Sequence, residues 1–230
     1  MKKIFVILIV LVLTSMSAWA NGSLEISTGQ HNFGLIPQNS ILVHTFWIKA
    51  VGTDTVRIDA IKTGCSCAIS KMERDWLAPG DSLAIEIEWD VSKYRNSIYR
   101  SIRIFYNNIK KPLRKGLKGT VIQTLDSARP VSISPYRFEL ASSALKEIDS
   151  IQFTLTNHSS GDQKIQNISK EPVQCKLVLP SIIPAGSSAT GYVRIYPEYK
   201  DKEFHTSVTL AIGDQQQTNL TIPIRRKIYR

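Results

Sequence analysis

The feature that most constrains the fold is an alternation of apolar and polar residues that begins after Gly29. In the segment 83–89 (LAIEIEW) every second residue is large and apolar. A period of two residues is that of a β-strand with one buried face. Such segments are separated by turn sequences such as Pro79-Gly80-Asp81, and none has a convincing helical period. The chain is therefore predicted to be all-β, with about seven short strands in its first half, as in a β-sandwich.

The second half of the chain repeats the first. The segment 46–54 (FWIKAVGTD) aligns with 153–162 (FTLTNHSSGD) with one inserted residue, and 78–82 (APGDS) aligns with 183–187 (IPAGS). A period of about 105 residues is the length of one sandwich. The prediction is two tandem sandwiches, at residues 24–122 and 136–230. They are joined by a linker at 123–135, where Pro130 and Pro135 interrupt the pattern.

Residues 1–20 have the features of a cleaved signal peptide. Lys2 and Lys3 precede the apolar run 4–13, and Ala18-Trp19-Ala20 supplies a cleavage site before Asn21. The run is shorter than the roughly 20 residues that a membrane-spanning helix needs. No later segment is apolar for long enough to cross a membrane. We therefore expect an exported protein, periplasmic, envelope-associated or extracellular, with no transmembrane segment in the mature chain.

The mature chain is basic. Without Lys2 and Lys3, 27 basic residues against 19 acidic ones leave a net charge of +8. Much of the excess lies in the segments 110–115 (KKPLRK) and 225–227 (RRK). One interpretation is that charged residues on edge strands prevent edge-to-edge pairing. The other is contact with an anionic envelope polymer or membrane surface. Nucleic acid is not expected as a partner of an exported protein.

Four sequence landmarks occur in order in the first half: His31 to Gly34, His44 to Ala50, Thr63 to Cys67, and Ala78 to Gly80. With these landmarks, residues 24–121 resemble the bacterial domain of unknown function family 1573, although Ala50 replaces the usual Asn. The resemblance implies an exported immunoglobulin-like sandwich and no established catalytic activity. The second half lacks the Cys-x-Cys motif, so it is predicted to be a divergent immunoglobulin-like domain.

Cys65 and Cys67 have three possible roles. On an extended strand both thiols would face the same side, where they could bind a soft metal such as Cu(I) together with His44, or with His31 or Met72. They could also form a redox-active disulfide, or pack as small apolar residues. The repeat alignment places Cys175 at the position of Cys67, which favours packing. His44 shares its parity with Phe46, so a core histidine is the alternative to a metal ligand.

Four Asp-Ser or Asp-Thr pairs precede an apolar residue. They resemble the O-glycosylation acceptor of exported proteins in one bacterial phylum, and the acceptor hydroxyls would be those of Thr55, Ser82, Ser127 and Ser150. The alternative is ordinary turn chemistry before a strand, because Asp and Ser side chains favour turns. Ser127, in the predicted linker, is expected to be the most accessible.

Enzyme motifs are missing: there is no Gly-x-Ser-x-Gly, no phosphate-binding glycine loop and no His-Glu-x-x-His. We expect no catalysis and no cofactor. The leading hypothesis is a binding or scaffolding module for another protein or an envelope polymer, with the segments 101–106 and 113–121 as exposed sheet edges. The alternatives are a two-domain periplasmic chaperone and a thiol or metal module using Cys65 and Cys67.

Overall fold

The structure, a computed structural model, describes residues 22–27, 29–213 and 218–229, and the predicted signal peptide lies outside this range. The described chain is all-β, as predicted, with one short 3-10 turn at Pro197–Tyr199 (η1). In the described residues, no helix is long and apolar enough to cross a membrane. The alternating segments form strands because their apolar positions pack between two sheets and their polar positions face out.

The first sandwich has two facing sheets around one core. One sheet has the order β1 (Ser23–Ile26), β3 (Ile41–Val51), β7 (Ser82–Asp90) and β5 (Ala68–Lys71). The other has the order β2 (Gln30–Pro37), β9 (Leu113–Ile122), β8 (Asn96–Tyr106), β4 (Val56–Lys62) and β6 (Trp76–Leu77). The predicted inward residues of β7, from Leu83 to Trp89, are all buried in this core.

The second sandwich repeats this topology strand by strand. One sheet has the order β10 (Val131–Ser134), β13 (Ser150–Asn157), β17 (Ser188–Ile195) and β15 (Cys175–Val178). The other contains β16 (Ile182–Ile183), β14 (Gln163–Asn167), β18 (Phe204–Ile212), β19 (Thr218–Ile228), β11 (Phe138–Ser142) and β12 (Glu147–Ile148). The parallel pair β11–β19 corresponds to the parallel pair β2–β9.

The predicted linker was drawn too long. Within 123–135, residues 131–134 form β10, which pairs with β13 of the second sandwich. Leu125 and Ala128 are buried in the second core. The connection between β9 and β10 is therefore residues 123–130, and its apolar side chains already belong to the second domain. Pro130 and Pro135 flank the strand β10, a position at which proline is tolerated. They therefore do not mark a linker.

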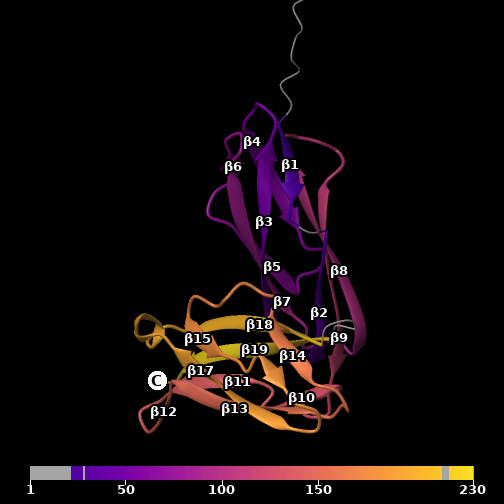
Figure 1. The fold of residues 1–230 in the computed structure, drawn as a ribbon. Helices are drawn as coiled ribbons and strands as arrows, with labels where there is room; N and C mark the ends of the chain where they lie inside the picture. Colours follow the sequence, from indigo (N-terminus) through magenta and orange to yellow (C-terminus); the bar gives the residue numbers. More distant parts are fainter. Residues whose placement is uncertain (1–21, 28, 214–217, 230) are drawn as a thin grey trace, which may run out of the picture.

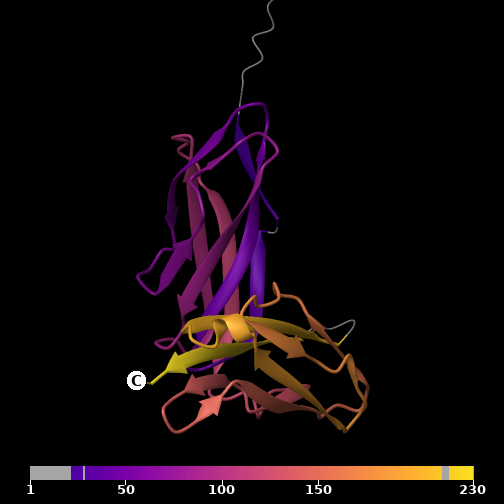
Figure 2. The same cartoon turned by 90° about the vertical axis from the view of Figure 1, so that its left-hand side faces the viewer.

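The two sandwiches are joined through a common sheet. β2 of the first pairs in parallel with β19 of the second, with Leu35 opposite Leu220. The sheet therefore continues from β16 in the second sandwich to β6 in the first. Figure 1 shows the first sandwich standing on the second, and the turned view in Figure 2 shows the same arrangement. The junction is a packed contact between domains.

The expected sheet edges were wrong. β8 lies between β9 and β4, and β9 lies between β2 and β8, so both are interior strands. The final strand β19 is interior too, because it pairs with β18 on one side and with β11 and β2 on the other. Basic residues on β9 and β19 therefore do not protect free edges. Alternation identifies strands, but it carries no information about their order in a sheet.

Candidate functional site

Cys65 and Cys67 form a disulfide in the turn between β4 and β5. The prediction that they lie on an extended strand was wrong. Their Cα atoms are 5.2 Å apart, whereas two residues of extended strand span roughly 6.6 Å. Gly64, with φ +79°, turns the backbone before the first cysteine. Both cysteines are half-buried and pack on the edge of the first core.

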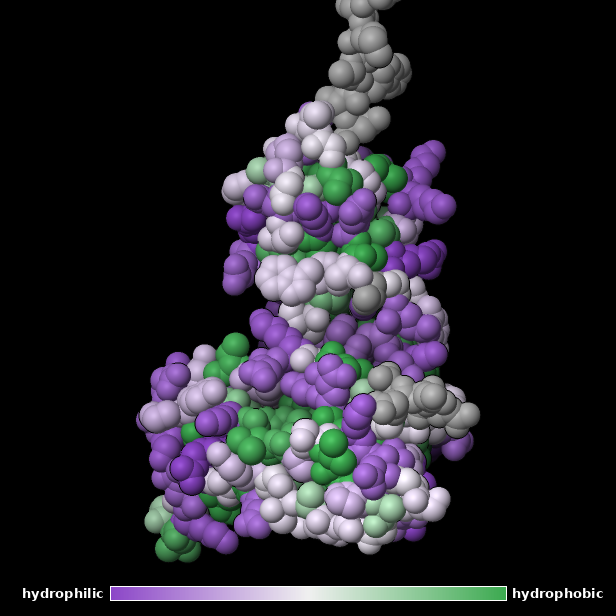
Figure 3. Space-filling model, viewed as in Figure 1, coloured by the Kyte–Doolittle hydropathy of each residue, from purple (hydrophilic) through white to green (hydrophobic). Residues whose placement is uncertain are grey.

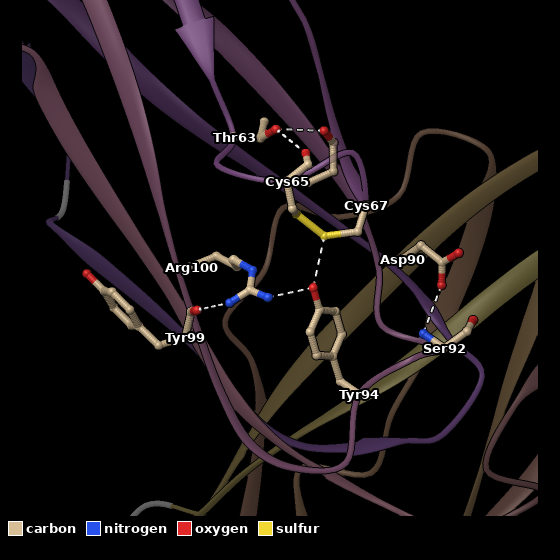
Figure 4. Close-up of a disulfide and its surroundings, with 9 residues drawn as sticks. Thr63, Cys65, Cys67, Asp90, Ser92, Tyr94, Tyr99 and Arg100 are labelled. Carbon is tan, nitrogen blue, oxygen red and sulfur yellow. Dashed lines mark hydrogen bonds between the residues drawn. A yellow bond between two sulfur atoms is a disulfide. The ribbon is translucent and has the colours of Figure 1, made fainter.

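A tyrosine and an arginine lie next to one of the two sulfurs (Figure 4). The Tyr94 hydroxyl is 3.2 Å from the Cys67 Sγ. Arg100 donates from Nη2 to that hydroxyl at 2.5 Å, and its guanidinium stacks on the Tyr94 ring. Sequence reasoning missed both residues. The sequence did indicate that Arg100 faces inward, because it alternates in step with the buried residues Ile98 and Ile102 of β8.

The turn around the disulfide is also held by ordinary hydrogen bonds. The Thr63 hydroxyl is 3.0 Å from the Cys65 carbonyl oxygen and 2.8 Å from that of Ala68, and donates to them. The backbone N–H of Asp90 donates to the Cys67 carbonyl. These contacts connect the turn to β5 and β7 without the sulfur–sulfur bond.

Cys175 does not stand at the position of Cys67. The bond from Asp90 N to Cys67 O has its counterpart in the bond from Tyr196 N to Gln174 O, so Cys175 corresponds to Ala68. The repeat alignment was one residue out here, because the turns before β5 and β15 differ. Cys175 is a free, buried thiol, and burial raises its pKa to about 12. It is a core residue and gives no support for a packing role of Cys67.

His44 packs against a second histidine, His31, at the end of the first core next to the second sandwich. Its ring stacks on that of His31, with the ring centroids 3.8 Å apart, and its Nε2 is buried without a hydrogen-bond partner. The described residues contain no cluster of three or more His, Cys, Asp or Glu suited to a metal ion. With the sulfurs joined, neither thiolate is available as a ligand. The metal site of Cys65, Cys67 and His44 therefore stays a prediction for the reduced protein only.

The histidine pair is held neutral by its surroundings. Burial and, to a smaller extent, the charge of the nearby Lys115 lower the pKa of His31 to about 4. Burial lowers the pKa of His44 to about 2, with contributions from His31 and Lys115. Lys115 is itself fully buried above the Phe46 ring, and burial lowers its pKa to about 8. This cluster lies beside the junction, where Thr209 of β18 is 3.5 Å from the His31 Nε2.

A row of basic residues crosses the outer face of the first sandwich. Lys62 on β4 is opposite Arg103 on β8, and Arg103 is opposite Arg114 on β9. Lys118 lies further along β9, opposite Tyr99. We call these four basic residues the basic face. In the described residues, none of the four has a carboxylate within ion-pair distance. In Figure 3, hydrophilic side chains, with apolar groups among them, lie along the right-hand edge of the first sandwich, where Figure 1 places β8 and β9.

The four possible glycosylation hydroxyls are spread over both sandwiches. Thr55, Ser82 and Ser127 are exposed, and Ser150 is half-buried at the start of β13. Ser82 likewise begins a strand, β7. The positions fit turn chemistry and leave three hydroxyls accessible, so glycosylation stays a prediction at these residues.

Together these features define the class: a tandem β-sandwich protein of the immunoglobulin-like kind, with a disulfide turn and a basic face on its first domain. Residues 24–121 match the family described as "Protein of unknown function (DUF1573)". This match confirms the family resemblance that the motifs of the first sandwich predicted. A comparison with curated protein sequences gave no match.

Two solved structures are examples of those that the chain matches. A protein of unknown function from Porphyromonas gingivalis W83 is 9% identical, with 88% of this chain and 99% of that chain covered and a TM-score of 0.33. The ASH/PapD-like domain 7 of human CEP192 is 12% identical, with 51% of this chain and 98% of that chain covered and a TM-score of 0.38.

Proposed function

We propose that this protein is a non-catalytic module of the bacterial cell envelope that binds an acidic polysaccharide through the basic face. The observation that carries the proposal is the row Lys62, Arg103 and Arg114, in register across three neighbouring strands. Export is part of the proposal. It is supported by the predicted signal peptide and by the disulfide, a bond that persists in oxidising compartments.

The row of like charges lowers the stability of the sheet, so its presence needs another explanation. Like charges directly opposite each other on neighbouring strands are destabilising. Edge protection does not explain them, because β8 and β9 are interior strands. A polyanion would relieve the repulsion, since neighbouring strands lie about 4.8 Å apart and so present cations at a regular spacing. A chain of sugars with repeated carboxylate or phosphate groups has the matching chemistry.

The basic face also offers a shallow surface and an aromatic ring. A hollow of about 430 Å³ is lined by residues that include Asn32, Tyr99, Lys118 and Thr120. The Tyr99 side chain is exposed and extends over Gly116, where an added Cβ would come within 3.2 Å of the ring. A flat ring beside cations suits a sugar, whose faces are apolar and whose substituents are charged.

The chaperone alternative has less support. A chaperone of the pilus-assembly type would be expected to offer a free strand edge to its client. The final strand β19 is instead paired on both sides and largely buried. The thiol alternative rests on a different site, and the two activities are separable.

The test is a binding titration of the mature protein with polygalacturonate at increasing NaCl, with neutral dextran as the uncharged comparison. We expect binding to polygalacturonate only, weakening as salt screens the charges. The double variant Arg103→Gln and Arg114→Gln is expected to lose most of the affinity. The matched control is Lys49→Gln with Lys176→Gln, two exposed lysines elsewhere, which removes the same charge. Equal losses in both doubles would mean non-specific attraction and would refute the proposed site.

A further inference from the structure

We infer that the Cys65–Cys67 disulfide is an exchangeable redox bond, in which an incoming thiolate attacks the Cys65 sulfur and Cys67 leaves as the thiolate. This inference concerns the turn between β4 and β5 and is independent of polysaccharide binding. Three observations carry it. The bond is not needed to hold the turn, only one of the two sulfurs has a hydrogen-bond donor among the described residues, and a positive charge lies behind that donor.

A disulfide at this position would contribute little to the stability of the fold. The stabilisation that a disulfide gives by restricting the unfolded chain grows with the loop that it closes, and this loop is three residues long. Thr63 already bonds to the carbonyls on both sides of the turn. The second sandwich makes the equivalent connection, residues 168–174 between β14 and β15, without a disulfide. The fold therefore does not require the sulfur–sulfur bond.

The surroundings of the two sulfurs are unequal. A disulfide sulfur has no hydrogen, so in the 3.2 Å contact with Cys67 it is the Tyr94 hydroxyl that donates. Arg100 donates to the same hydroxyl oxygen, which leaves the phenolic hydrogen directed at sulfur. In the described residues, no corresponding donor is found for the Cys65 sulfur. Hydrogen bonds to an ionised acceptor are about twice as strong as those to a neutral one, so this arrangement favours a thiolate at Cys67.

The charge of Arg100 is not neutralised by an acid. Its contacts among the described residues are the Tyr94 hydroxyl and ring and the Tyr99 carbonyl, and no carboxylate forms an ion pair with it. Its Nε is buried without a hydrogen-bond partner. A nearby arginine lowers the pKa of a thiol, and a thiol of lower pKa is the better leaving group in exchange.

The exchange balances in two steps. In the first step the thiolate of a small thiol or of a protein dithiol forms a bond to the Cys65 sulfur. The Cys65–Cys67 bond breaks, and its electron pair stays on Cys67. A second thiolate then attacks the outer sulfur of the mixed disulfide and releases Cys65, which takes up a proton. Two thiols are oxidised to one disulfide, and the protein disulfide is reduced to a dithiol.

The experiment measures reduction of the folded mature protein in mixtures of reduced and oxidised glutathione, followed by alkylation and intact mass. We expect the disulfide to be reduced while the protein remains folded, with two alkyl groups added and Cys175 unlabelled. Tyr94→Phe and Arg100→Gln are each expected to slow the reduction and shift the equilibrium toward the disulfide by about tenfold. The first removes the hydrogen bond to the Cys67 thiolate, and the second removes the positive charge behind it. In the reduced protein, the pH at which Cys67 becomes reactive should rise in both variants.

The matched controls are Tyr192→Phe, an exposed tyrosine of the second sandwich, and Lys93→Gln, an exposed cation next to Tyr94. Both are expected to behave as the wild type. The inference is overturned if Tyr94→Phe and Arg100→Gln match these controls, or if reduction occurs only when the protein unfolds. The alkylation pH profile separates an effect on the thiolate from a general loosening of the turn. Polygalacturonate binding should be unchanged in Tyr94→Phe and Arg100→Gln, whichever way the redox test turns out, because the two sites are separate.

Discussion

Gly34 and Asn219, one from each sandwich, approach more closely than any side chain on Gly34 would allow. A Cβ added to Gly34 would lie 1.9 Å from the Asn219 carbonyl oxygen, and Gly34 has φ +68°. The Asn219 side chain donates to the Asn32 carbonyl two residues away. Gly34 therefore provides both the irregularity in the β2–β9 register between Asn32 and Leu35 and the close approach of β19.

Gly34→Ala should destabilise the protein by about 3 kcal/mol or more, because it combines a left-handed backbone with a clash against backbone. Urea unfolding followed by tryptophan fluorescence would measure this. Trp47, Trp76 and Trp89 all lie in the first sandwich, so the signal reports on that domain. Gly29→Ala, with open space around the added Cβ, is the control. Equal stability of the two variants would contradict the docking role.

Asn157→Ala should cost about 2–4 kcal/mol, because the buried Asn157 amide donates to the carbonyls of Gly161, Ile183 and Pro184, and these would lose their donor. Calorimetry of the variant would show the loss. Gln152→Ala, at an exposed position of the same strand, is expected to remain within about 0.5 kcal/mol of the wild type. A similar loss in both variants would refute the role of the amide.

Stability should fall as the pH drops from 6.5 toward 4. The folded protein holds His31 and His44 with lowered pKa values, so between the folded and unfolded pKa values the unfolded chain binds more protons. The stability that depends on the two neutral rings is fully present well above pH 6.5. At pH 5.5, one pH unit below the unfolded pKa, each histidine should have lost about 1.4 kcal/mol, or about 3 kcal/mol for the pair. His44→Gln should flatten the pH dependence of urea midpoints between pH 7 and 5.5. A slope unchanged by His44→Gln would exclude the pair as its source.

Arg103→Glu should stabilise the first sandwich by about 0.5–1 kcal/mol while it abolishes polysaccharide binding. A carboxylate between Lys62 and Arg114 replaces two repulsions with two attractions across the strands. Lys49→Glu is the opposite control, because Lys49 already faces Glu25 and the change creates a repulsion. Thermal denaturation would compare the two, and destabilisation by Arg103→Glu would contradict the account of the row.

Replacing both cysteines of the turn should leave the fold intact. For Cys65→Ser with Cys67→Ser we expect a loss of about 1–2 kcal/mol, as a three-residue loop implies. A circular-dichroism spectrum and a urea midpoint would measure it. A loss of several kcal/mol would make the disulfide a structural element and weaken the case for exchange.

Strand positions were predictable from sequence because burial of one face imposes a period of two, as in β7. The repeat was predictable because its turns conserve their chemistry. Ala50 and Asn157 occupy equivalent places, since their backbone N–H groups donate to Asp81 and Ser187 in the same way. The order of strands in each sheet depends on long-range pairing that no local pattern records, and β8 and β9 were therefore misplaced.

The candidate sites were less accessible to sequence reasoning than the strands. The cysteine pair was visible, but its turn geometry depends on Gly64 and Thr63. Its neighbours Tyr94 and Arg100 come from segments about thirty residues away. The basic face was present in the sequence only as a charge excess, because Lys62, Arg103 and Arg114 become a row through the register of three strands. Contacts of this kind require the fold.

The pairing of β2 with β19 has a mechanical consequence. Two domains on a flexible tether swivel independently, so that a pull on one leaves the other at rest. Here the sheet runs from one domain into the other, and Ser207 of β18 also bonds to both backbone groups of Val43. The two sandwiches are therefore expected to move as one rigid body. A force applied at the basic face would be transmitted through the shared sheet to the far end of the second sandwich.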